Sequence, residues 1–167
     1  MLAVYRAASD VSVLANSTAP FFTVSGVANK IMYIKRVYID SPTATNGAFL
    51  NIGVDRCSSG ASGGTSVTLT NAKIDIESPD SSAVVKVYSV APTPGTVVAR
   101  LSSRRVYSHK ATPSADGLNM AVELLKAEYG KHPVMLKGED DHLCIYFLSA
   151  PGSAVTCTMR IEWSEEG

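Results

Sequence analysis

The sequence predicts an all-β protein, an antiparallel β-sandwich or jelly roll of about eight to ten strands. The first observation behind this prediction is a series of short apolar or alternating runs, spaced roughly every 8–15 residues. The second is that glycine, proline, asparagine and serine, which favour turns, separate these runs. The third is that helix-length patterns, with apolar residues three and four positions apart, are nearly missing.

The clearest strand lies near the C-terminus, where apolar and polar residues alternate from residue 155 to residue 163. A period of two places successive side chains on opposite faces of a sheet. One face is therefore apolar, and it carries Val155, Cys157, Met159, Ile161 and Trp163. Residues 143–148 are almost wholly apolar, and a short Pro-Gly loop at 149–153 follows them. We predict that the two runs form a hairpin.

Two longer strands are predicted upstream. Residues 30–40 are rich in tyrosine, isoleucine and valine, which suit a pleated surface. The alternation predicts one shared face for Ile31, Tyr33, Val37 and Ile39, with the polar Lys35 interrupting it. A turn is expected at residues 41–47, because Asn-Gly adopts positive φ at little cost. Residues 48–55 alternate again and direct Ala48, Leu50, Ile52 and Val54 inward.

The other apolar runs are shorter. Strands are expected near residues 21–24, 67–69, 74–76, 84–90, 96–101, 106–107 and 134–136. The glycine-rich residues 57–65 are expected to be a linker or hairpin tip, because no lysine-serine or lysine-threonine pair follows, as a phosphate-binding loop requires. Residues 118–129 fit a helix face and a strand face equally, and their position among strands favours a strand. Residues 1–28 are expected to form an N-terminal arm or edge strands, and residues 29–167 the jelly-roll domain, within a single domain overall.

Composition limits the classes of partner. Apolar residues make up 46% of the chain and charged residues only 18%, so we expect part of the surface to be covered by a partner or by copies of the protein. Fifteen basic and fifteen acidic residues give a net charge of zero, which provides no attraction for nucleic acid or a membrane surface. No apolar run approaches the length of a membrane span, and no secretory signal is recognisable.

No metal, cofactor or catalytic residue is predicted. The three cysteines lack CxxC spacing; Cys144 and Cys157 are expected to be buried thiols, with a bridge between them as the alternative. The histidines, His109, His132 and His142, lie in or beside polar segments and show no HExxH spacing. The acidic run at 139–141 lacks the spacing of a calcium loop and is expected to be a solvated turn. We therefore expect a protein that is not an enzyme.

Four residues are candidates for an interface. Arg104 and Arg105 form the densest basic stretch, with Arg100 and Lys110 nearby, and the aromatic Tyr107 follows them. A pair of arginines makes few phosphate contacts, so a subunit interface or surface role is favoured over nucleic-acid binding. Trp163 is the single tryptophan, and tryptophan often anchors interfaces. The alternative for Trp163, which we favour, is a core position.

Segments of the chain from about residue 30 to the end together resemble small virion-associated proteins of tailed bacteriophages. They are Lys30 to Ile39 (KIMYIKRVYI), Gly60 to Leu69 (GASGGTSVTL), Ala83 to Gly95 (AVVKVYSVAPTPG), His132 to Gly138 (HPVMLKG) and Arg160 to Glu166 (RIEWSEE). The resemblance implies a jelly roll and suggests a capsid decoration (cement) protein on the outer virion surface, made in the host cytoplasm. The implied partners are the major capsid protein and the protein itself, as a homodimer or homotrimer.

Two other functions stay open at this stage. A tail-fibre, neck or other appendage module on the same scaffold would bind a receptor or glycan through a concave aromatic and acidic patch. The loops offer Tyr107, Tyr129 and the acids at 139–141 for such a patch. A cupin-like enzyme would need clustered histidine and glutamate ligands, and the scattered histidines argue against it.

Overall fold

The computed structural model describes residues 3–13, 17–110, 121–127 and 133–167. Within these ranges the chain forms twelve strands and no helix. The strands are β1 (Ala3–Val13), β2 (Phe22–Ser25), β3 (Ile31–Ala44), β4 (Ala48–Cys57), β5 (Thr65–Thr68), β6 (Ala72–Lys73), β7 (Val84–Val90), β8 (Val97–Lys110), β9 (Ala121–Lys126), β10 (Val134–Lys137), β11 (His142–Phe147) and β12 (Val155–Glu166). The all-β prediction is confirmed, although the strand count exceeds the eight to ten predicted.

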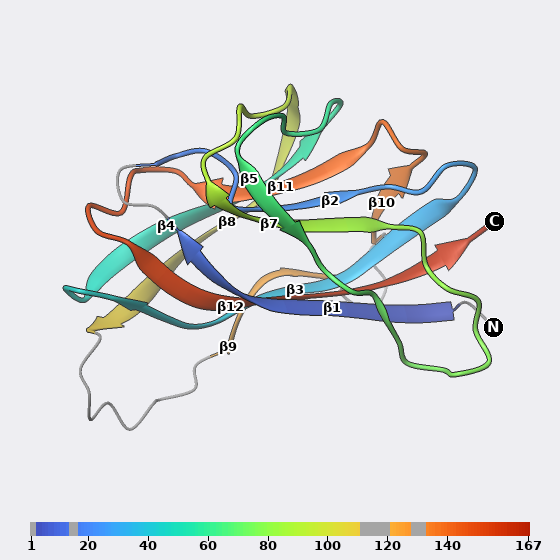
Figure 1. The fold of residues 1–167 in the computed structure, drawn as a ribbon, viewed down its shortest axis with the longest axis horizontal. Coiled ribbons are helices and arrows are strands. Elements are labelled where there is room, and N and C mark those ends of the chain that lie inside the picture. Colours follow the sequence, from blue (N-terminus) through green and yellow to red (C-terminus); the bar gives the residue numbers. More distant parts are fainter. Residues whose placement is uncertain (1–2, 14–16, 111–120, 128–132) are drawn as a thin grey trace.

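The strands form two layers of a single curled sheet (Figure 1). Layer A contains β6, β1, β12 and β3 in that order, and both β9 and β10 pair with the far side of β3. Layer B contains β5, β7, β2, β11, β4 and β8 in order. The two layers join where the end of β8 pairs in parallel with β3, at Thr43↔His109 and Ala44↔Lys110. All other strand pairings in the described chain are antiparallel, so the fold is broadly that of a β-sandwich or jelly roll.

The C-terminal strand lies at the centre of layer A. β12 pairs with β1 from Val13↔Val155 to Ala3↔Glu165, and on its other side it pairs with β3. Its predicted apolar face is confirmed, because Val155, Cys157, Met159, Ile161 and Trp163 are all buried. The inward residues predicted for β4 are confirmed at Leu50, Ile52 and Val54, which lie across the core in layer B. The core thus fills the space between the two layers.

A bulge corrects the predicted face of β3. The register against β12 shifts between Arg36↔Glu162 and Ile34↔Trp163, which leaves Lys35 as an extra residue on β3. A bulge of one residue reverses the alternation beyond it. Met32 and Ile34 are therefore buried, in place of the predicted Ile31 and Tyr33, while Val37 and Ile39 point inward as predicted. The polar Lys35 marked this bulge in the sequence.

A second bulge in β3 explains why the strand continues through its predicted turn. The register shifts between Asp40↔Thr158 and Thr43↔Thr156, where β3 has one more residue than β12. Pro42 lies in this interval. Proline has no N–H to donate, and within sheets it is confined to edges and bulges. β3 therefore passes Pro42 and ends at Ala44 instead of at the predicted residue 40.

The predicted hairpin of the two C-terminal strands is wrong. β11 pairs with β2 and β4 in layer B, whereas β12 pairs with β1 and β3 in layer A. The loop between them therefore crosses from one layer to the other (Figure 1). The apolar side chains of both strands belong to one core cluster. Each strand must bury an apolar face. Two strands in facing layers bury these faces as well as two strands paired in a hairpin do.

The N-terminal segment contributes a strand to each layer. β1 lies between β12 and the two-residue β6, next to the edge of layer A. β2 lies between β7 and β11 in the interior of layer B, and Phe22 and Val24 on it are fully buried. Residue 28 therefore marks no break in the fold. In the ambiguous segment, residues 121–126 form the favoured strand, β9, while residues 118–120 and 128–129 lie outside the described residues.

Candidate interaction surface

The arginines of this protein divide into two groups. Four of them form ion pairs with carboxylates: Arg6–Glu162, Arg56–Asp141, Arg100–Asp55 and Arg160–Asp40. A fifth, Arg36, donates a hydrogen bond to the Tyr38 hydroxyl at 3.1 Å. Arg104 and Arg105 are exposed, and neither has a carboxylate partner among the described residues. The basic pair singled out in the sequence is thus also set apart by its surroundings.

Arg105 belongs to a cluster on the outer face of β4 and β8. Antiparallel pairing places Phe49 opposite Tyr107, and the two rings meet edge to face with centroids 5.2 Å apart. The Arg105 guanidinium lies 4.1 Å from the centre of the Phe49 ring, in cation–π geometry. His109 extends the row, with its ring 5.6 Å from that of Tyr107. These four residues and Arg104 are called the β8 patch below.

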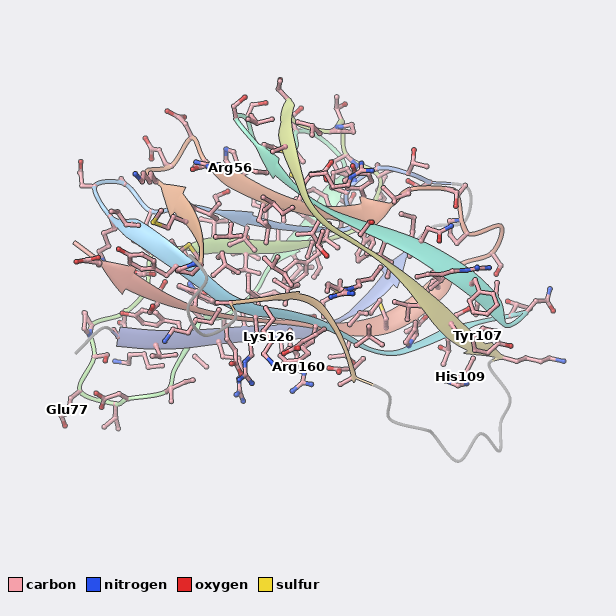
Figure 2. All side chains as sticks on the ribbon, turned by 180° about the vertical axis from the view of Figure 1, so that it is seen from behind. Arg56, Glu77, Tyr107, His109, Lys126 and Arg160 are labelled. Carbon is pink, nitrogen blue, oxygen red and sulfur yellow. The ribbon has the colours of Figure 1, made fainter. Side chains whose placement is uncertain are left out.

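Four of the five side chains of the patch are exposed, and that of His109 is half-buried. Phe49 is 58% exposed and Tyr107 is 47% exposed, which is unusual for large rings that are already packed against each other. The turn before β4 supports Tyr107, because a Cβ placed on Gly47 would lie 2.6 Å from the Tyr107 hydroxyl. Glycine at this turn therefore leaves room for the end of the Tyr107 side chain. Figure 2 shows Tyr107 and His109 together near one end of the molecule.

The strand geometry separates Arg104 from Arg105. Arg105 pairs with Asn51, which shares the outward alternation of Phe49, whereas Arg104 pairs with Ile52 on the core side. Arg104 is nevertheless exposed. β8 is the last strand of layer B, and its free edge pairs with β3 only at His109 and Lys110, so no described strand lies beside that edge at Arg104. The two guanidinium groups therefore lie on the two sides of one sheet edge.

Trp163, the fourth candidate, does not belong to this surface. It is fully buried in layer A and stacks on Tyr5, with ring centroids 5.7 Å apart. Its indole Nε1 donates to Glu165 at 3.1 Å. The structure therefore assigns Trp163 to the core, which is the alternative that the sequence favoured.

Sequence reasoning missed Phe49 and His109. The alternation that directs Leu50 and Ile52 inward also directs Phe49 outward, and an aromatic residue at an outward position was the available signal. His109 lies beside a polar segment without metal-binding spacing, so the sequence did not single it out. Its partners could not be found from the sequence, because the pairing of β4 with β8 depends on tertiary structure.

A polar network covers another part of the outer face of layer B. The Asp55 carboxylate is fully buried and accepts hydrogen bonds from Arg100, at 3.0 Å and 3.4 Å, and from the Tyr146 hydroxyl. Burial, followed by the hydrogen bond to Asp55, raises the pKa of Tyr146 above its ordinary value. This network joins β4, β8 and β11 through side chains, so its evident role is structural.

Next to this network, Cys57 and Cys144 contact each other beside a small pocket of about 110 Å³. The hydrogen bond from Cys144 lowers the pKa of Cys57, and the same contact together with burial raises the pKa of Cys144. All three cysteines are buried and none forms a disulfide, in agreement with the favoured prediction. The alternative bridge between Cys144 and Cys157 is not formed.

The charged turn before β11 contains both exposed and ion-paired acidic residues. Glu139 and Asp140 are exposed, as predicted. Asp141 is buried, because it forms an ion pair with Arg56 and accepts the backbone N–H of Lys137 at 3.1 Å. The prediction of a solvated turn is therefore wrong for Asp141.

An open hollow of about 550 Å³ lies beside this turn. Glu139, Asp140, His142 and Lys86 are among the residues that line it, and the described lining contains no phenylalanine, tyrosine or tryptophan. The His142 Nδ1 lies 2.9 Å from the Ser25 hydroxyl oxygen, and burial lowers the pKa of His142. His132 and Tyr129 lie outside the described residues.

The described part of the chain holds no group of three histidine, cysteine or acidic side chains suited to a metal ion. In the same residues, no helix is long and apolar enough to cross a membrane. Comparisons with protein-family models, with curated proteins and with solved structures find no match.

Proposed function

We propose that the protein is a structural component of a tailed-bacteriophage particle, a decoration protein that binds the major capsid protein on the outside of the head. The sequence resemblance from residue 30 to the C-terminus suggests this class. The single structural observation that supports it is the β8 patch. Exposed aromatic rings and arginines without carboxylate partners are the residue types that protein interfaces concentrate.

The proposed mechanism is mass action. A decoration protein binds the assembled lattice and not dispersed capsid subunits, so that its binding free energy adds to the stability of the intact shell. No covalent chemistry is required. A rigid sandwich suits this role, because a preformed surface loses little conformational entropy on binding.

The test uses emptied heads of the phage whose genome encodes the chain. We expect the protein to sediment with the heads and to raise their melting temperature. The variant Arg105→Ala with Tyr107→Ala should bind more weakly, whether the patch contacts capsid or a second copy that adds avidity. The control, Arg6→Ala with Glu162→Ala, removes an ion pair from the outer face of layer A and should bind as the unmodified protein does. Protein that stays in the supernatant at saturating concentration would refute the proposal.

A second candidate is an appendage module that binds a glycan, and the hollow beside Glu139 and Asp140 is the observation that favours it. Carboxylates bind sugar hydroxyl groups, but the aromatic platform expected of such a site is missing from the described lining. Binding to a glycan array that is lost in Glu139→Gln with Asp140→Asn would support this function. If the decoration proposal is correct, the variant Glu139→Gln with Asp140→Asn should still sediment with the heads as the unmodified protein does.

A further inference from the structure

A second unusual surface lies in the turn that follows β6. Ile76 is 83% exposed and Ile74 is 57% exposed, and Asp75 and Glu77 alternate with them. The turn is held in place by the backbone: Ile74 N–H donates to the Val4 carbonyl at 3.0 Å. Within the turn, the Glu77 N–H donates to the Asp75 carboxylate at 3.1 Å. Residues 74–77 are called the acidic turn below.

The carboxylates of this turn form no ion pair within the part of the chain that the structure describes. The nearby Lys73 pairs with Asp80 at 3.1 Å and not with Asp75 or Glu77. Among the described residues, neither of these two acids forms an ion pair. The acidic turn therefore presents two aliphatic side chains and two uncompensated negative charges to solvent.

The acidic turn is complementary to the β8 patch. One surface combines exposed isoleucines with unpaired carboxylates, and the other combines exposed aromatic rings with unpaired guanidinium groups. We propose that the acidic turn of one copy docks on the β8 patch of a second copy. Asp75 and Glu77 would face Arg105 beside the rings of Phe49 and Tyr107, which Ile76 would cover, while Arg104 would add positive charge from the other side of the same sheet edge.

The positions of the two surfaces determine the kind of assembly. Figure 2 shows Glu77 and Tyr107 at opposite ends of the long axis of the molecule. A two-fold contact of one β8 patch against another would bring the arginines of both copies together, and like charges in contact are unfavourable. The contact must therefore join the acidic turn of one copy to the β8 patch of another, either reciprocally in an antiparallel two-fold dimer or head-to-tail in a closed ring or an open chain. The inference rests on the proposed function in one respect, that the protein acts as an assembly.

The test measures self-association by light scattering and sedimentation in the absence of capsid. We expect the unmodified protein to form oligomers that weaken as salt is added, because the charges involved are exposed. Arg104→Glu with Arg105→Glu should weaken association by roughly 100-fold or more, since like-charge contacts across an interface are costly. Asp75→Lys with Glu77→Lys should do the same. The control, Glu139→Lys with Asp140→Lys, reverses two exposed acids elsewhere and should associate normally.

Combining the two reversals in one chain separates pairing from general damage. The chain with all four substitutions has an acidic β8 patch and a basic turn, so its oligomers should return. Mixing the two double variants should restore rings of even number and open chains, but not rings of odd number, because the copies must alternate. Failure of the fourfold variant to associate, or an unmodified protein that stays monomeric at millimolar concentration, would overturn the inference.

The outcome is distinguishable from that of the proposed function. Oligomers that follow the charge reversals but ignore emptied heads would uphold the inference and refute the decoration proposal. Monomers that bind heads through the β8 patch would support the decoration proposal and refute the inference of self-association. Native folding of every variant is checked by the fluorescence of the buried Trp163, which lies in neither surface.

Discussion

Replacement of Glu165 with alanine is expected to destabilise the protein far more than the same replacement at the next residue. The Glu165 side chain is 3% exposed and accepts hydrogen bonds from three groups. Trp163 Nε1 donates at 3.1 Å, Lys30 Nζ donates at 2.9 Å, and the Ser81 hydroxyl donates as well. One carboxylate therefore joins β12 to the start of β3 and to the segment before β7.

The magnitude follows from these contacts. Alanine would leave the buried indole N–H of Trp163 without an acceptor, which costs about 1–3 kcal/mol. The ion pair with Lys30 is partly screened, because the Lys30 side chain is 31% exposed, and it contributes at most about 1 kcal/mol. The hydrogen bond from Ser81 adds about 1 kcal/mol. The expected loss is about 3 kcal/mol, which lowers the melting temperature of a domain of this size by about 6–12 °C.

The measurement is urea unfolding together with calorimetry. Glu166→Ala is the matched control: Glu166 is exposed, and among the described residues only the Tyr33 hydroxyl donates to its side chain, so its loss should stay within about 0.5 kcal/mol. Glu165→Gln should fall between the two, since an amide oxygen still accepts from Trp163 while the charge opposite Lys30 is lost. Equal destabilisation by Glu165→Ala and Glu166→Ala would refute the reasoning.

Three further predictions follow from burial. The thiols of Cys57, Cys144 and Cys157 should resist a water-soluble disulfide reagent in the folded protein and react in urea; a fast reaction before unfolding would contradict their burial. The emission of Trp163 should lie at short wavelength and shift to the red on unfolding, and the emission of a solvated indole in the native protein would contradict the core assignment. Burial raises the pKa of Tyr146 above 10.0, so the folded state keeps a proton that the unfolded state loses. The free energy of unfolding should therefore fall above pH 10.0, and urea midpoints of Tyr146→Phe should fall less steeply; an equal slope would contradict this.

Much of the candidate site could be recognised in the sequence, but its arrangement could not. Arg104, Arg105 and Tyr107 were identified because basic and aromatic residues are close together in the chain. Phe49 joins them only because β4 pairs with β8, with a register that brings Phe49 opposite Tyr107. That the two arginines have no carboxylate partner among the described residues is likewise a property of the folded chain. The acidic turn was interpreted as a strand near residues 74–76, because its isoleucines resemble strand residues until their exposure is known.

The sequence by itself determined the class of the fold and most of the inward faces. A period of two is a local property, so the apolar faces of β12 and β4 could be read directly from alternation. Tertiary structure decided where alternation breaks and which strands become neighbours. The bulge at Lys35 reversed the face of β3, and β11 and β12 joined different layers instead of forming a hairpin. Both outcomes depend on contacts between distant segments, because an apolar strand can bury its face against any complementary layer, and only the packed core selects which one.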